Sequence, residues 1–82
     1  MLGKKRNKNE IKTRIRLDTL SDVNKFVEVM CRLECPVWLE DGYGCRVSAK
    51  SMLAVLYSLE WGEIYCYCEK DISVHLFPWM AY

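Results

Sequence analysis

The apolar residues of this chain repeat with two different spacings, and the order of these spacings limits the folds it can adopt. Apolar and polar residues alternate from Ile11 to Leu17, which predicts a half-buried strand with basic side chains on its solvent face. Thr19 or Ser21 can then cap a helix that Pro36 must stop. The buried stripe expected along this helix repeats every three or four residues, at Val23, Phe26, Val27, Met30 and Leu33.

The middle of the chain carries the signals of a hairpin and a second helix. We expect strands at residues 37–40 and 45–48, joined by the turn residues 41–44, whose Asp-Gly-Tyr-Gly composition favours a tight connection. A helix is expected from Met52 to Ser58, and the Trp61-Gly62 pair should end it.

Alternation returns at residues 63–69, which predicts a fourth strand. Asp71 is expected to cap a final helix, which Pro78 must disturb because proline lacks a backbone donor. Residues 79–82 should fold back over the sheet edge, with an exposed apolar patch as the alternative. The order β-α-β-β-α-β-α predicts an α+β fold, an open-faced sandwich with a four-stranded antiparallel sheet covered on one side by three helices.

Charge is distributed unevenly along the chain. Residues 1–16 contain seven basic residues and Glu10, whereas the remainder has a net charge of −5. We predict a disordered basic arm at residues 1–10 and one folded domain at residues 11–82. The arm could contact nucleic acid or an acidic partner, although simple solvation explains it as well. No membrane-length apolar run or signal peptide is evident, so we expect a cytoplasmic protein without membrane partners.

The five cysteines do not indicate a disulfide framework, because their number is odd and nothing suggests secretion. We expect reduced thiols, with small core residues at Cys31, Cys45, Cys66 and Cys68. No Cys-x-x-Cys pair is present, so neither a metal site nor another cofactor is expected. The chain also lacks a catalytic triad motif and a glycine-rich phosphate loop, and we do not expect an enzyme.

One stretch, Val47 to Leu56, leads from a strand through Ala-Lys-Ser into an apolar helical run. Ser51 is a suitable N-cap there, and a phosphate on its hydroxyl would meet the positive end of the helix dipole. The stretch resembles the Ala-Lys-Ser-Ile-Met-Gly box of the histidine-containing phosphocarrier protein (HPr) family. The resemblance extends over the element order of residues 11–72 and implies the HPr-like fold with strand order 1-4-2-3.

The acceptor loop of this family contains Gly-Leu-His-Ala-Arg-Pro, in which the histidine carries the phosphoryl group. In this chain the corresponding segment, residues 18–20, is Asp-Thr-Leu, so that Thr19 or Leu20 occupies the histidine position. Neither side chain has a nucleophilic ring nitrogen, and we infer a divergent member whose phosphohistidine relay is lost. His75 lies in the final predicted helix and is interpreted as a surface or packing residue.

The resemblance implies a non-catalytic regulatory protein of carbon catabolite control. Its Ser51 would be phosphorylated by an HPr kinase/phosphorylase, and the product would bind a transcriptional repressor. The predicted docking residues are Lys50, Met52, Leu53 and Leu56. The alternatives are a structural or protein-interaction domain that keeps only the fold, in which Ser51 is a helix cap, and a nucleic-acid accessory domain that uses the arm. Exposure of Met52 and Leu53 would favour docking.

Overall fold

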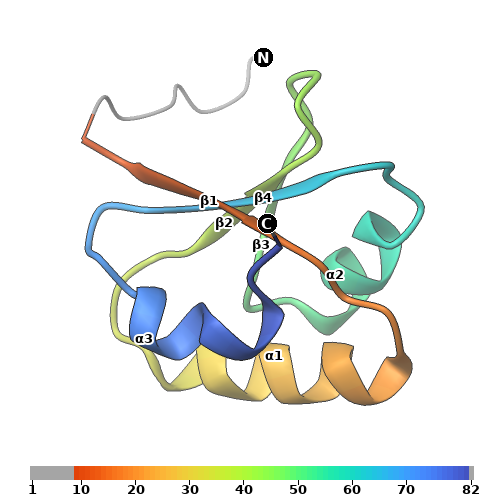
Figure 1. Cartoon of the computed structure of the whole chain (residues 1–82), viewed down its shortest axis with the longest axis horizontal. Coiled ribbons are helices and arrows are strands. Elements are labelled where there is room, and N and C mark those ends of the chain that lie inside the picture. The colour runs from red at the N-terminus through yellow and green to blue at the C-terminus, as the bar shows by residue number, and fades with distance from the viewer. Residues whose placement is uncertain (1–8, 82) are drawn as a thin grey trace.

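The computed structural model describes residues 9–81 and has the predicted order of elements (Figure 1). The basic residues at positions 4, 5, 6 and 8 and the C-terminal Tyr82 lie outside the described residues. The elements are β1 (Ile11–Ile15), α1 (Leu20–Arg32), β2 (Trp38–Glu40), β3 (Arg46–Ser48), α2 (Met52–Ser58), β4 (Ile64–Cys68), α3 (Ser73–Leu76) and a 3₁₀ turn (Phe77–Trp79).

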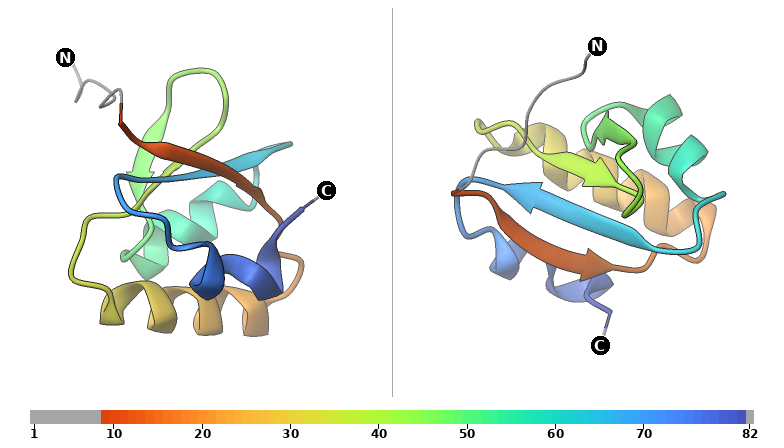
Figure 2. Two further views of the ribbon diagram at one scale, coloured as in Figure 1. Left: turned by 60° about the vertical axis from the view of Figure 1, so that its left-hand side comes forward. Right: turned by 90° about the horizontal axis from the view of Figure 1, so that it is seen from above.

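The four strands form one antiparallel sheet in the order β1-β4-β2-β3. Ile15 lies opposite Ile64 in the β1–β4 pair, and Leu39 lies opposite both Cys66 of β4 and Val47 of β3. The helices cover one face of this sheet and leave the other, which we call the open face, without helical cover (Figure 2). The predicted α+β sandwich and the strand order implied by the resemblance are therefore confirmed.

The core lies between α1 and the covered face of the sheet. The predicted stripe of α1 is buried at its first four positions, whereas Leu33 is half-buried and forms the C-cap of the helix before Pro36. Leu39, Cys66 and Val55 contribute to this core from β2, β4 and α2. The two periodic patterns thus correctly place Phe26 and Ile15 inside, whereas Ile11, on the predicted apolar face of β1, is 44% exposed.

The C-terminal segment covers the outer edge of β1. Pro78 lies in the 3₁₀ turn that follows the short α3, so the expected disturbance of the final helix is confirmed. The carbonyl of Trp79 accepts a hydrogen bond of 2.7 Å from the Arg16 amide, and the Ala81 amide donates one of 3.0 Å to the Arg14 carbonyl. The Trp79 side chain is buried, as predicted. These hydrogen bonds pair backbone N–H and C=O groups that an exposed edge strand would leave without a protein partner.

The structure decides between the two expected caps of α1 and shifts the start of the final helix. Of Thr19 and Ser21, it is Thr19 that caps α1. The N-cap of α3 is Ile72, although the carboxylate of Asp71 accepts a 3.0 Å hydrogen bond from the Ser73 amide. This contact is the largest reason why the pKa of Asp71 is lowered. Asp71 therefore accepts a hydrogen bond from the first turn of α3, as a cap would, although it lies one residue before the N-cap position.

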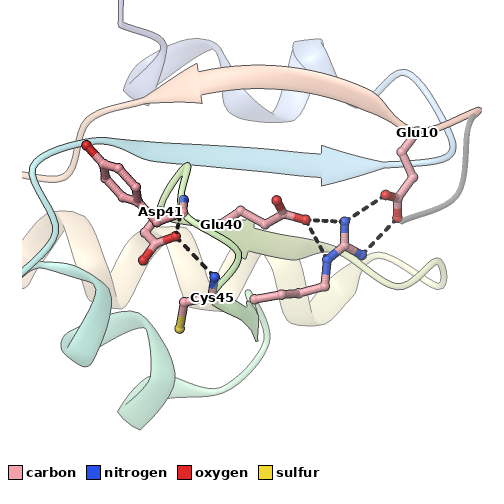
Figure 3. Close-up of polar contacts among 6 residues, drawn as sticks. Glu10, Glu40, Asp41 and Cys45 are labelled. Atoms are coloured by element: carbon pink, nitrogen blue, oxygen red, sulfur yellow. Dashed lines mark hydrogen bonds and ion pairs between the residues drawn. The ribbon is translucent and has the colours of Figure 1, made fainter. Parts of the chain in front are cut away.

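The predicted turn between β2 and β3 depends on two glycines with positive φ, Gly42 at 88° and Gly44 at 103°. Side-chain-bearing residues rarely adopt this backbone region. The Oδ1 atom of Asp41 accepts hydrogen bonds from the amides of Tyr43 and Cys45 and so organises the turn (Figure 3).

None of the helices among residues 9–81 is long and apolar enough to cross a membrane.

Candidate functional site

Ser51 is exposed at the start of α2 and caps this helix, as predicted. Its Oγ accepts a hydrogen bond of 3.3 Å from the Ala54 amide, and its carbonyl accepts one of 2.9 Å from the Val55 amide. The first turn of α2 contains no acidic residue. An anionic group on the Ser51 hydroxyl would therefore meet the positive end of the helix dipole without a neighbouring carboxylate in that turn.

Apolar side chains project from α2 next to Ser51. Leu53 is 79% exposed, Tyr57 is 57% exposed and Met52 is 37% exposed. We call these three residues the α2 surface. Tyr57 was not predicted as a docking residue, although its spacing of four from Leu53 places both on one helix face. Trp61 packs edge-on against Tyr57, with ring centroids 6.0 Å apart, and orients this aromatic side chain.

The other two predicted docking residues are held by contacts inside the molecule. The ammonium of the half-buried Lys50 donates a hydrogen bond of 2.5 Å to the carbonyl of Leu33, at the C-terminal end of α1. Leu56 is half-buried and packs against the core. The exposed part of the predicted docking set is therefore Met52 and Leu53, while Lys50 neutralises a helix end that is partly negative.

Residues 18–20, predicted to correspond to the HPr acceptor loop, lead into α1 and form a capping box. Oγ1 of Thr19 accepts a hydrogen bond of 3.0 Å from the Asp22 amide, and the Asp22 carboxylate accepts hydrogen bonds from the amides of Asp18 and Thr19. Leu20, the other candidate for the histidine position, is 67% exposed. The Asp22 carboxylate thus occupies the two backbone donors that precede α1 and places a negative charge at this helix terminus.

A surface hollow of about 660 Å³ lies between residues 14–18 and the connection from α2 to β4. Its lining includes Trp61 and two exposed ion pairs. Arg16 lies 3.0 Å from Asp18, and Arg14 lies 3.7 Å from Glu63. Because each of these arginines faces a carboxylate, the hollow presents mixed charge and does not form a preorganised anion site.

The open face of the sheet carries a buried ion triad that sequence reasoning missed (Figure 3). Arg46 of β3 donates hydrogen bonds to Glu10 at 2.8 and 3.1 Å and to Glu40 of β2 at 2.7 Å. The Glu10 and Glu40 side chains are each 5% exposed. The hydrogen bonds to Glu10, followed by those to Glu40, raise the pKa of Arg46 against the effect of burial. Its guanidinium also lies over the rings of Trp38 and Tyr67.

The thiols are all unpaired within the described residues, but the prediction of four core cysteines is wrong for Cys31. Cys31 is exposed, and its Sγ donates to the Lys50 carbonyl at the outer margin of the α1–α2 contact. Cys66 and Cys68 are buried as expected, and Cys45 is half-buried. Burial raises the pKa of Cys66 to about 12. Among residues 9–81 no group of three or more histidine, cysteine and acidic side chains could hold a metal ion.

No family model, curated protein or solved structure matches this chain. The functional argument therefore depends on the residues of the chain and on their arrangement in the fold.

Proposed function

We propose that this protein is a non-catalytic, cytoplasmic relative of the HPr phosphocarriers that acts in carbon catabolite control. Ser51 would be its phosphorylated switch, and the α2 surface would contact the protein partner. One observation carries this proposal: the exposed Ser51 hydroxyl lies directly beside the exposed Met52 and Leu53. A phosphate at Ser51 would add roughly −1.5 to −2 charge at the edge of an apolar surface.

The geometry of the acceptor loop supports the loss of the phosphohistidine relay. The Thr19 hydroxyl accepts from the Asp22 amide as a helix cap, and the Asp22 carboxylate accepts from the amides of Asp18 and Thr19. A negative charge there would repel an incoming phosphoryl group, and the exposed Leu20 has no nucleophilic atom. His75 lies in α3, outside the acceptor loop.

The second candidate is a protein-interaction domain that has kept the fold and has no phosphorylation switch. The same exposure of the α2 surface favours it, because docking through Leu53 and Tyr57 does not need a modified serine. The two candidates differ in one respect only, which is whether phosphorylation of Ser51 changes the affinity for the partner.

Intact-mass spectrometry after incubation with ATP and HPr kinase tests the switch. We expect the mass of one phosphate in the wild-type chain and none in Ser51→Asn, which retains a good N-cap but has no hydroxyl. A second incubation, with phosphoenolpyruvate and enzyme I, should add no phosphate. Phosphate gained from enzyme I would contradict the lost relay, and an unmodified wild-type chain in the kinase reaction would favour the second candidate.

Binding of the phosphorylated chain to a catabolite-control repressor tests the docking surface. Leu53→Ser should weaken this binding at least tenfold, because it removes the most exposed apolar side chain of the α2 surface. Val74→Ser is the matched control, since Val74 is 78% exposed on α3. Equal loss of binding in both variants would mean that general apolar contact, and not the α2 surface, holds the partner.

A further inference from the structure

Two cysteines far apart in the sequence have their sulfur atoms in contact. The Sγ of Cys35 lies 3.4 Å from the Sγ of Cys68. Cys68 is the last residue of β4, and Cys35 lies in the connection between α1 and β2. Trp38 pairs with Tyr67 in the β2–β4 ladder, and this register brings the chain just before β2 alongside the end of β4.

We propose that Cys35 and Cys68 form a reversible disulfide when the protein meets hydrogen peroxide. Only a small movement separates the dithiol from the disulfide, because the sulfurs must approach from 3.4 Å to about 2.05 Å. Cys35 can supply this movement, since it belongs to a connection and not to a strand of the sheet.

The two sulfurs differ in access, which assigns the order of the steps. Cys35 is half-buried and can meet peroxide, whereas Cys68 is 2% exposed. Burial is the largest reason why the pKa of Cys68 is raised, so this thiol stays protonated and reacts poorly with an external oxidant. Cys35 is therefore the attacking residue, and Cys68 is the resolving one.

The chemistry balances with peroxide as the oxidant. The Cys35 thiolate attacks one peroxide oxygen, an S–O bond forms, the O–O bond breaks and the departing oxygen takes a proton to become water. The Cys68 sulfur then attacks the Cys35 sulfenic sulfur. The S–S bond forms as the S–O bond breaks, and the Cys68 proton leaves with the hydroxide as a second water. Both thiols are oxidised, and one peroxide is reduced to two waters.

Peptide mapping of the full chain tests the proposal. The protein is treated with a small molar excess of hydrogen peroxide, remaining thiols are alkylated, and a protease that cleaves after glutamate is added. Cleavage at Glu34, Glu40, Glu63 and Glu69 isolates Cys35 in the peptide 35–40 and Cys68 in the peptide 64–69. We expect these peptides to be joined, with fragmentation assigning the link to Cys68 and not to Cys66, and dithiothreitol should separate them.

Variants distinguish this pair from general thiol oxidation. Cys35→Ser should abolish the link, whereas Cys45→Ser, at another half-buried thiol, should leave it intact. Oxidation should also raise the Tm of the wild type by several degrees and leave that of Cys35→Ser unchanged, since the bond constrains the unfolded chain. The proposal is overturned if Cys35 reaches the sulfinic acid or joins a second molecule while Cys68 remains open to alkylation after unfolding.

Discussion

The Nη2 atom of Arg46 lies 2.6 Å from the Oε2 atom of Glu40, directly across the β2–β3 ladder. Nη1 and Nη2 of the same guanidinium donate to the Glu10 carboxylate, so that one cation is paired with two carboxylates. The triad lies on the open face (Figure 3), the side of the sheet that no helix covers (Figure 2). It connects the start of the described chain to the hairpin and fixes Arg46 over the Trp38 and Tyr67 rings.

Removing the shared cation should strongly destabilise the fold. Arg46→Met leaves two buried carboxylates without their partner, and we expect a loss of about 3–5 kcal/mol in the free energy of unfolding. Urea denaturation measures this loss. Arg32→Met is the control, because Arg32 and Glu28 form an exposed pair within α1 whose contribution should be about 0.3–0.5 kcal/mol. Similar losses in the two variants would contradict a special role for the triad.

The capping box of α1 predicts a difference between two neighbouring hydroxyl residues. Thr19→Ala removes the oxygen that accepts from the Asp22 amide and should lower the free energy of unfolding by about 1 kcal/mol. Ser21→Ala, inside the first turn, should change it by less than about 0.5 kcal/mol. Thermal unfolding followed by circular dichroism compares the two variants. The reverse ranking would show that Ser21 is the cap in solution.

The C-terminal segment should contribute a large part of the stability through Trp79. Its ring packs edge-on against Phe26 with centroids 5.4 Å apart. Trp79→Ala should cost about 3–5 kcal/mol, because it opens a cavity between α1 and the edge of β1. Phe77→Ala, at a neighbouring residue that is 71% exposed, should change stability by less than about 0.5 kcal/mol in the same urea titration. A small effect of Trp79→Ala would mean that the segment detaches readily.

The buried thiol of Cys66 predicts weaker folding at high pH. Its pKa is about 12 in the folded chain and near 9.0 when the thiol is in water, so the unfolded chain loses the proton first. Between these values the folded state binds more protons, and the free energy of unfolding should fall by up to about 1.4 kcal/mol per pH unit. Free energies of unfolding from urea titrations at pH 8 and above should show this slope.

Cys66→Ala should reduce that slope, whereas Cys31→Ala should leave it unchanged because Cys31 is exposed. Burial also raises the pKa of Cys68, so Cys68 adds a slope of the same sign and the Cys66 variant loses only part of the effect. A Cys66 variant with the full wild-type slope would contradict the assignment.

Local sequence patterns predicted most of the helices and strands, but they carry no information about which strands lie next to each other. Alternation identified β1 and β4, and the spacing of Val23 and Phe26 identified the buried face of α1, since both signals arise from a few consecutive residues. The strand order was implied by the resemblance to HPr, because periodicity does not specify which strands are neighbours.

Contacts between distant residues escaped the sequence analysis. The pairing of Glu10 with Arg46 and the contact of Cys35 with Cys68 depend on strand register, which no local pattern encodes. Cys31 was misassigned because it lies beside the apolar stripe, where a shift of one residue moves a side chain from core to solvent. At the candidate site, the Ser51 cap was predictable from local chemistry, whereas the inward contact of Lys50 with Leu33 was not.

The position of β4 in the sheet also determines when the chain can fold during synthesis. β4 is hydrogen-bonded to both β1 and β2, so the first strand has no sheet partner until β4 has been translated. Ile11 pairs with Cys68 in the β1–β4 ladder, and the long separation of such partners in the sequence slows folding. A nascent chain that ends before β4 can form helical segments and the β2–β3 hairpin, but its apolar faces stay unburied and in need of protection from aggregation.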